Sequence, residues 1–185
     1  TFSLYWPGAG SGWRSFLGGF SALLGGLLTG GGLFILGAAV LLELTTIEMS
    51  PAMKQLSEKI LSLMLDQPWW LAWVLIAILP ACLEELLFRG WVLSAFCGEK
   101  PGKQRMATAV FVQAICFAIF HLLPERMPQT FLLGIALGTI VLLTKSIYPA
   151  ILCHIANNSM PLLLLYMTGI QDKDSLPESV ATDVA

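Results

Sequence analysis

Long apolar runs dominate the chain, and most charged residues lie between them. A helix of about twenty apolar residues crosses about 30 Å of hydrocarbon. One run without charge lies between Arg14 and Glu43, and another begins at Pro68. The pattern therefore predicts an all-α, polytopic membrane helix bundle with about five transmembrane helices, at 16–42, 68–83, 106–123, 127–144 and 147–167.

A different pattern occupies residues 53–66, where apolar residues recur at helical spacing and charged residues fill the opposite side. The apolar positions are Leu56, Ile60, Leu63 and Met64, and the charged ones are Lys54, Glu58, Lys59 and Asp66. This is typical of an amphipathic helix at the membrane interface, and a solvated loop helix is the alternative. The tryptophans that follow at 69, 70 and 73 indicate an aromatic belt at the membrane boundary.

The runs divide the chain into three parts. Residues 1–67 hold the first crossing and the interfacial helix, 68–168 hold the other four crossings, and 169–185 form a polar, loose tail. Gly26 and Gly30, and likewise Gly134 and Gly138, have the Gly-x-x-x-Gly spacing that lets helix backbones approach closely in lipid. For the first pair, simple glycine richness is the favoured explanation.

Composition supports the membrane assignment. Hydrophobic residues make up 56% of the 185 residues and charged residues 12%, against about half and a quarter in soluble domains. A net charge of -2 without any basic stripe excludes nucleic acid as the main partner. The positive charges divide almost evenly between the two predicted membrane sides, so the orientation is only weakly determined. Four cysteines in apolar stretches are predicted to be buried thiols: Cys82, Cys97, Cys116 and Cys153.

Three ionisable residues interrupt the second run, namely Glu84, Glu85 and Arg89. An ionisable residue within the membrane is a candidate functional residue. Adjacent residues on a helix point about 100° apart, whereas Glu85 and Arg89 have the four-residue spacing of a same-face ion pair. Glu84 is therefore left free for chemistry, and a helix-packing cluster of all three is the alternative. Glu84 and His154 lie at the same depth in the membrane only if a helix is tilted or broken, near Pro80 or Gly90.

The only two histidines of the chain, His121 and His154, also lie in apolar runs. Either one alone is more often a buried core residue than a catalyst. Because the bilayer penalises every polar side chain, convergence of Glu84, His121, His154 and Asn158 on one water-accessible cavity is the least unfavourable arrangement. His154 and Asn158 share a helix face and could grip one oxygen atom. Asn157 points to another face, and its match to the glycosylation pattern is nominal within a membrane.

Three motifs follow one another on successive predicted helices: Glu-Glu-x-x-x-Arg at 84–89, Phe-x-x-x-His at 117–121 and His-x-x-x-Asn at 154–158. In this order they resemble the CPBP intramembrane proteases, also called the Abi or CAAX type II prenyl endopeptidase family. The resemblance covers roughly 68–168, which it identifies as the catalytic core, and it implies a glutamate-dependent intramembrane endopeptidase.

The resemblance also implies roles for the motif residues. Glu84 would be the general base that activates water, helped by His121, while His154 and Asn158 would stabilise the oxyanion. Glu85 and Arg89 would brace the helix, and Phe117 would pack the site. No cofactor is expected. The implied partners are the lipid bilayer and a peptide or lipidated-protein substrate, cleaved near its C-terminus by a multi-pass protein of a prokaryotic cytoplasmic membrane.

Other chemistries remain open on the same residues. Glu84, His121 and His154 could form a three-ligand zinc site of a metalloprotease, but the chain has no His-Glu-x-x-His motif and Asn158 is a poor zinc ligand, so the metal-free account is favoured. A cysteine nucleophile is less favoured, because Cys82 and Cys153 face differently from their polar neighbours.

A non-catalytic function is the alternative to an enzyme. The polar cluster could bind an ion or a proton in a transporter-associated module, or the chain could be an accessory protein such as a bacteriocin self-immunity factor. A transporter would be expected to show an internal repeat, and none is evident. A place in a larger membrane complex, or as one domain of a fused permease, is a further prediction.

Overall fold

The computed structural model describes residues 67–98 and 101–167, together with 21, 24–25, 28–32, 35–37, 51, 54–55, 59 and 62. Within those residues the chain forms helices and no strand, which confirms the all-α class for this part of the protein. The predicted first crossing at 16–42 and the interfacial helix at 53–66 lie mostly outside the described residues, and the tail at 169–185 lies wholly outside them.

One long helix of 29 residues, Trp69–Cys97, carries the acidic motif. It consists of α3 (Trp69–Trp73), the π-helical η1 (Val74–Ile78), α4 (Leu79–Glu85), the π-helical η2 (Leu86–Val92) and α5 (Leu93–Cys97). Pro80 has no N–H to donate and its ring would collide with the carbonyl four residues earlier. The wider turns of η1 lie directly before it. The helix is therefore widened near Pro80 and again around Gly90, and is not broken at either residue.

Three further helices complete the described bundle: α6 (Lys103–Phe120), α7 (Met127–Thr144) and α8 (Tyr148–Met167), with a short 3-10 turn, η3 (Pro124–Arg126), before α7. The predicted bounds of the crossing at 127–144 are confirmed. Helix α6 begins three residues earlier than predicted and ends before His121, because Leu122 adopts a left-handed backbone with φ 57°. Helix α8 begins one residue later than predicted.

Two helices of the described part are long and apolar enough to cross a membrane, Trp69–Cys97 and Met127–Thr144. In their most apolar windows, 28% and 33% of the residues are buried within the protein, so most of this apolar surface faces outward. Helices α6 and α8 carry more polar residues, among them Gln113 and His154. The number of five crossings therefore stays a prediction.

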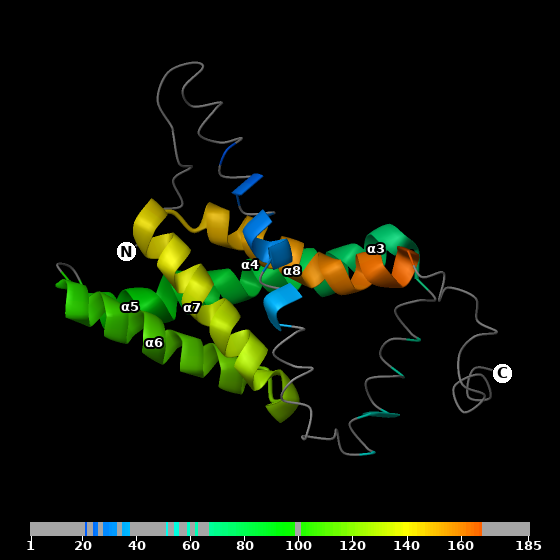
Figure 1. Ribbon diagram of the computed structural model, residues 1–185, viewed down its shortest axis with the longest axis horizontal. Helices are drawn as coiled ribbons and strands as arrows, with labels where there is room; N and C mark the ends of the chain where they lie inside the picture. Colours follow the sequence, from blue (N-terminus) through cyan, green and yellow to red (C-terminus); the bar gives the residue numbers. More distant parts are fainter. Residues whose placement is uncertain are drawn as a thin grey trace.

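Helices α6 and α7 form a closely packed pair (Figure 1). A Cβ atom added to Gly134 would lie 2.9 Å from the Cα of Ala114, and one added to Gly138 would lie 2.9 Å from Nε2 of Gln113. The Gln113 Nε2 donates a hydrogen bond of 2.7 Å to the carbonyl of Gly134. The close approach predicted from this glycine pair is confirmed. The Gly26 of the other predicted pair lies outside the described residues, whereas Gly30 lies directly against Cys153 and Ala156.

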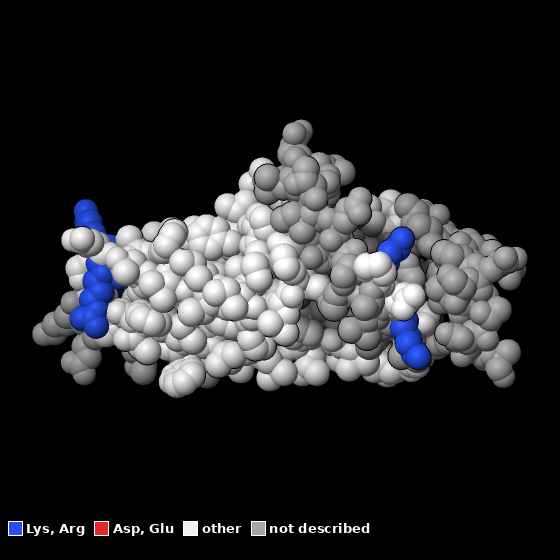
Figure 2. All heavy atoms as spheres, turned by 90° about the horizontal axis from the view of Figure 1, so that it is seen from below, with Lys and Arg blue, Asp and Glu red and all other residues white. Residues whose placement is uncertain are grey.

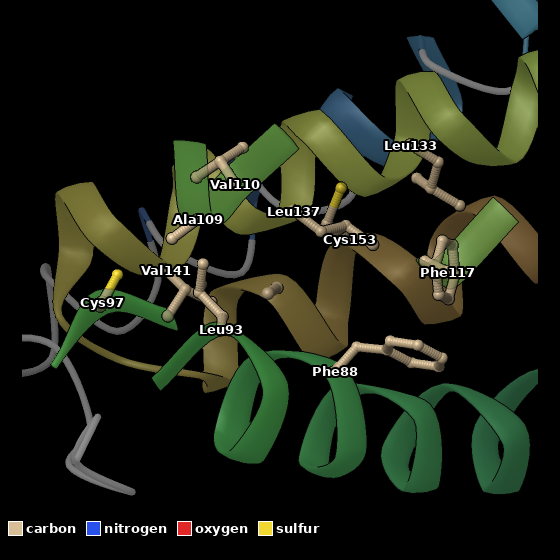
Figure 3. Close-up of a cluster of buried hydrophobic side chains, with 11 residues drawn as sticks. Phe88, Leu93, Cys97, Ala109, Val110, Phe117, Leu133, Leu137, Val141 and Cys153 are labelled. Atoms are coloured by element: carbon tan, nitrogen blue, oxygen red, sulfur yellow. The ribbon is translucent and has the colours of Figure 1, made fainter. Parts of the chain in front are cut away.

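The buried core lies where α6, α7 and α8 meet the second half of the long helix (Figure 3). Phe88 and Phe117 pack edge to face there, with ring centroids 5.1 Å apart. Cys97 and Cys153 are buried, as predicted, and Cys82 is half-buried. The prediction is wrong for Cys116, which is exposed on α6. An apolar run does not show which residues face lipid, so a thiol within it can point either way.

Positive side chains lie at both ends of the α6–α7 pair. Arg105 and Lys145 are exposed at one end and Arg126 at the other. Figure 2 shows two separate groups of Lys and Arg on one face, and the described surface between them carries no charged residue in this view. Helix α7 has 18 residues, and a rise of 1.5 Å per residue makes it about 27 Å long, close to the thickness of the hydrocarbon core. Helix α7 is therefore long enough to cross most of the hydrocarbon core, and the orientation of the protein in the membrane stays a prediction.

Candidate active site

The two adjacent acids at the end of α4 have different surroundings. Glu85 is fully buried, whereas the side chain of Glu84 is 19% exposed. Successive side chains diverge by about 100° on an α-helix, so one residue points into the bundle while the other lies at its margin. The two acids therefore differ in burial and in most of their neighbours, although both face His154.

Glu85 lies at the centre of a buried ionic network. Its Oε1 accepts a hydrogen bond of 2.8 Å from Nη1 of Arg89, and both side chains have no exposed surface. This confirms the ion pair predicted from the four-residue spacing. The same Oε1 lies 2.8 Å from Nδ1 of His154, which is 69 residues away in the chain and on α8. Glu85 therefore connects α4 to α8, a contact that the sequence analysis missed.

Glu84 faces both histidines. Its Oε2 lies 3.7 Å from Nε2 of His154 and 3.9 Å from Nε2 of His121. These distances are too long for direct hydrogen bonds, and they are of the kind that a single water molecule bridges. The Oε2 atom is buried and has no hydrogen-bond partner among the described residues. Side chains from α4, from the end of α6 and from α8 thus meet at one carboxylate oxygen.

Each histidine is held by its other nitrogen. The Nδ1 of His121, at the C-cap of α6, lies 2.9 Å from the carbonyl of Phe117, and the Nδ1 of His154 lies against Glu85. Carbonyl and carboxylate oxygens only accept hydrogen bonds, so Nδ1 carries a proton in both rings. The Nε2 atoms that face Glu84 are left for chemistry. His154 is 1% exposed and His121 is 25% exposed.

Phe117 lies between the Glu85–Arg89 ion pair and the two histidines. The guanidinium carbon of Arg89 is 4.4 Å from its ring centroid. The ring also contacts His121 and His154 edge on, at 4.7 and 5.7 Å between centroids. A cation above an aromatic face is attracted by the ring quadrupole. Phe117 therefore fixes the relative positions of the ion pair and both imidazoles.

Asn158 follows His154 by one turn of α8 and is half-buried. The shared helical face places it on the same side of α8 as His154. Its Oδ1 accepts a hydrogen bond of 3.3 Å from Nδ2 of Asn157. His121 and His154 thus both lie within 4 Å of Oε2 of Glu84. Asn158 is placed near them by its position one turn after His154 on α8.

The side chains of Glu84, His121 and His154 are spaced more widely than the ligands of an ideal tetrahedral zinc ion. Two ligand atoms of a tetrahedral zinc ion are about 3.3 Å apart, closer than the 3.7 and 3.9 Å between Glu84 and the histidines. In the part of the chain that the structure describes, no group of three His, Cys, Asp or Glu side chains could hold a metal ion. The metalloprotease alternative therefore has no support from these residues.

Comparison with protein-family models places the chain in a known family. Residues 66–160 match the family model described as type II CAAX prenyl endopeptidase Rce1-like. No curated protein and no solved structure matches the chain. The matched range includes every residue of the three motifs, from Glu84 to Asn158. The chain therefore belongs to the Rce1-like family of type II CAAX prenyl endopeptidases, a family of membrane proteases.

Proposed function

We propose that this protein is a multi-pass intramembrane endopeptidase in which Glu84 activates a water molecule. One observation carries the proposal: two imidazoles from different helices, each held at Nδ1, direct Nε2 toward the same oxygen of Glu84. A general base must lie within hydrogen-bonding reach of its proton, directly or through one water molecule. The site supplies such a base and two further groups around it.

The reaction follows from these positions. Glu84 takes a proton from the water, whose oxygen attacks the carbonyl carbon of the scissile peptide bond. His121 holds the water through Nε2. The carbonyl oxygen becomes an oxyanion, which accepts hydrogen bonds from His154 and Asn158. When the intermediate collapses, the C–N bond breaks and Glu84 returns its proton to the departing amine.

Glu85 has a role in this scheme beyond bracing its helix. Since the Nδ1 proton of His154 is engaged by Glu85, His154 donates from Nε2 only when it carries both protons. Glu85 then balances the charge of that imidazolium, as it balances Arg89. Buried charges are tolerated when they are paired and hydrogen-bonded. With Glu84 ionised, the two carboxylates balance Arg89 and the imidazolium of His154, and the net charge of the site is zero.

The substrate class follows from the location of the site and from the family. A carboxylate between membrane helices would reach a bond in a membrane-associated peptide, and the family name refers to prenylated C-terminal Cys-a-a-X sequences. We expect cleavage near the C-terminus of a peptide or lipidated protein in the bilayer. No observation favours the accessory or transporter alternative over this activity.

Glu84→Gln tests the proposal, and Glu85→Gln is the matched comparison for the effect on stability. Purified protein in lipid vesicles would be given a prenylated Cys-a-a-X peptide and its unprenylated counterpart. Loss of a general base lowers turnover by about 10²–10⁴-fold, so Glu84→Gln should lose cleavage and keep the wild-type unfolding midpoint. Glu85→Gln should lower that midpoint. Wild-type cleavage by Glu84→Gln would overturn the proposal, and thiol alkylation that abolished cleavage would favour a cysteine nucleophile instead.

A further inference from the structure

Asn157 is a buried polar residue that the proposed mechanism does not use. It lies on α8 directly before Asn158, and 8% of its surface is exposed. Burying an amide in an apolar environment is costly unless its hydrogen bonds are made. Polar residues within membrane helices therefore have a functional or a packing reason to be there.

The contacts of Asn157 point to its neighbour. Its Nδ2 donates to Oδ1 of Asn158 at 3.3 Å, while its own Oδ1 is buried without a partner among the described residues. Gly30 lies over the same part of α8, where an added Cβ would come within 3.1 Å of the backbone nitrogen of Asn157. Asn157 is thus covered on this side by another segment, and its amide reaches the proposed oxyanion site through Asn158.

We propose that Asn157 is a positioning residue that fixes the orientation of the Asn158 carboxamide; the inference rests on the proposed function. The two ends of a carboxamide are alike in shape and opposite in hydrogen bonding: the oxygen only accepts and the NH₂ group only donates. An oxyanion needs the donor. Because Asn157 holds the oxygen of Asn158, the NH₂ group of Asn158 is left to face the substrate.

The size of the effect follows from preorganisation. Removing one oxyanion donor costs about 10²–10³-fold in kcat. Without Asn157, Asn158 keeps its donor but loses the contact that holds it in the productive orientation, so the loss should be smaller, about 10-fold in kcat. An interaction made with the transition state alone leaves KM almost unchanged.

The experiment is a double-mutant cycle on cleavage of the same peptide in vesicles. Asn157→Leu and Asn157→Ala, which differ in volume, should each lower kcat about 10-fold and change KM less than about 2-fold. Asn158→Ala should lower kcat about 10²–10³-fold, and adding Asn157→Leu to it should cause no further loss. Ser159→Ala is the control, because Ser159 bonds only its own helix, at the carbonyl of Ile155, in the described part; its kcat should equal wild type.

The outcomes separate this inference from the function on which it rests. Wild-type kcat in both Asn157 variants, with a large loss in Asn158→Ala, would overturn the role of Asn157 and leave the oxyanion role of Asn158 standing. An equal loss from Asn157→Leu in the wild-type and Asn158→Ala backgrounds would also overturn it, because Asn157 would then act elsewhere. Full activity in Asn158→Ala would refute the oxyanion role itself.

Discussion

The buried ion pair of Glu85 and Arg89 allows a prediction about stability: losing Glu85 should destabilise the protein more than losing Arg89. Both side chains have no exposed surface, and their atoms lie 2.8 Å apart. Replacing either one by an apolar residue of similar size, as in Arg89→Met or Glu85→Leu, leaves the other as a buried charge. The two remaining charges differ in what else they contact.

The structure sets the magnitude. Removing one partner of a buried ion pair costs about 3–5 kcal/mol. After Arg89→Met, Glu85 still has Nδ1 of His154 at 2.8 Å, so we expect the lower limit, about 3 kcal/mol. After Glu85→Leu, Arg89 has the Phe117 ring and His154 has lost its Nδ1 partner, so we expect about 5 kcal/mol. Both are large fractions of a typical total of about 5–15 kcal/mol.

Thermal unfolding in detergent or in vesicles measures the difference. At this chain length, a loss of 1 kcal/mol in unfolding free energy lowers the unfolding midpoint by about 2–4 °C. The midpoint should therefore fall by roughly 6–12 °C for Arg89→Met and by roughly 10–20 °C for Glu85→Leu. The double variant, which removes both charges, should be more stable than Glu85→Leu alone. Glu84→Gln is the control and should shift the midpoint little. Equal shifts for the two single variants would refute the idea that His154 supports Glu85.

Other predictions follow from the packing, the backbone and the metal-free site. Gly134→Ala should destabilise the protein by about 1–3 kcal/mol, because its Cβ would lie 2.9 Å from the backbone of Ala114. Gly31→Ala should not, since no described atom lies within 4 Å of the added Cβ, and equal unfolding midpoints for the two variants would contradict the close approach. Lys145→Gly should stabilise by up to about 1 kcal/mol, since Lys145 ends α7 with φ 55°; a lower midpoint would show that its side chain matters more. Treatment with a chelator should leave cleavage intact, and activity restored by zinc would refute the metal-free proposal.

Features that follow from residue types and their spacing along one helix were predicted well from the sequence. The ion pair at 85 and 89 depends only on helical spacing, and the bounds of α7 depend on charged residues at its two ends. The close contact at Gly134 depends on the absence of side chains at residues four apart. Each of these follows from the order and spacing of residues along a single helix, which the sequence alone determines, although the helix that packs against Gly134 does not follow from it.

Features that depend on which helices face each other could not be predicted in the same way. Periodicity shows that His154 lies on one face of α8, but it does not show that Glu85 lies opposite. The sequence predicted an irregularity near Pro80 or Gly90, but it did not predict its form, the π-helical turns of η1 and η2. The end of α6 at His121 depends on the left-handed backbone of Leu122, which the sequence pattern does not indicate.

The buried ionic network around Glu85 explains why two adjacent acids can have different roles in a membrane. Glu85 supports the fold through Arg89, and through the same oxygen it holds the imidazole that faces Glu84. Substitution at Glu85 should therefore affect stability and catalysis together, whereas substitution at Glu84 should affect catalysis alone. A variant such as Arg89→Met, which leaves Glu85 bound to His154, should lose stability while keeping most of its turnover per folded molecule. If turnover fell in proportion to stability in the variants of Glu84, Glu85 and Arg89 alike, the two acids would be acting as one unit.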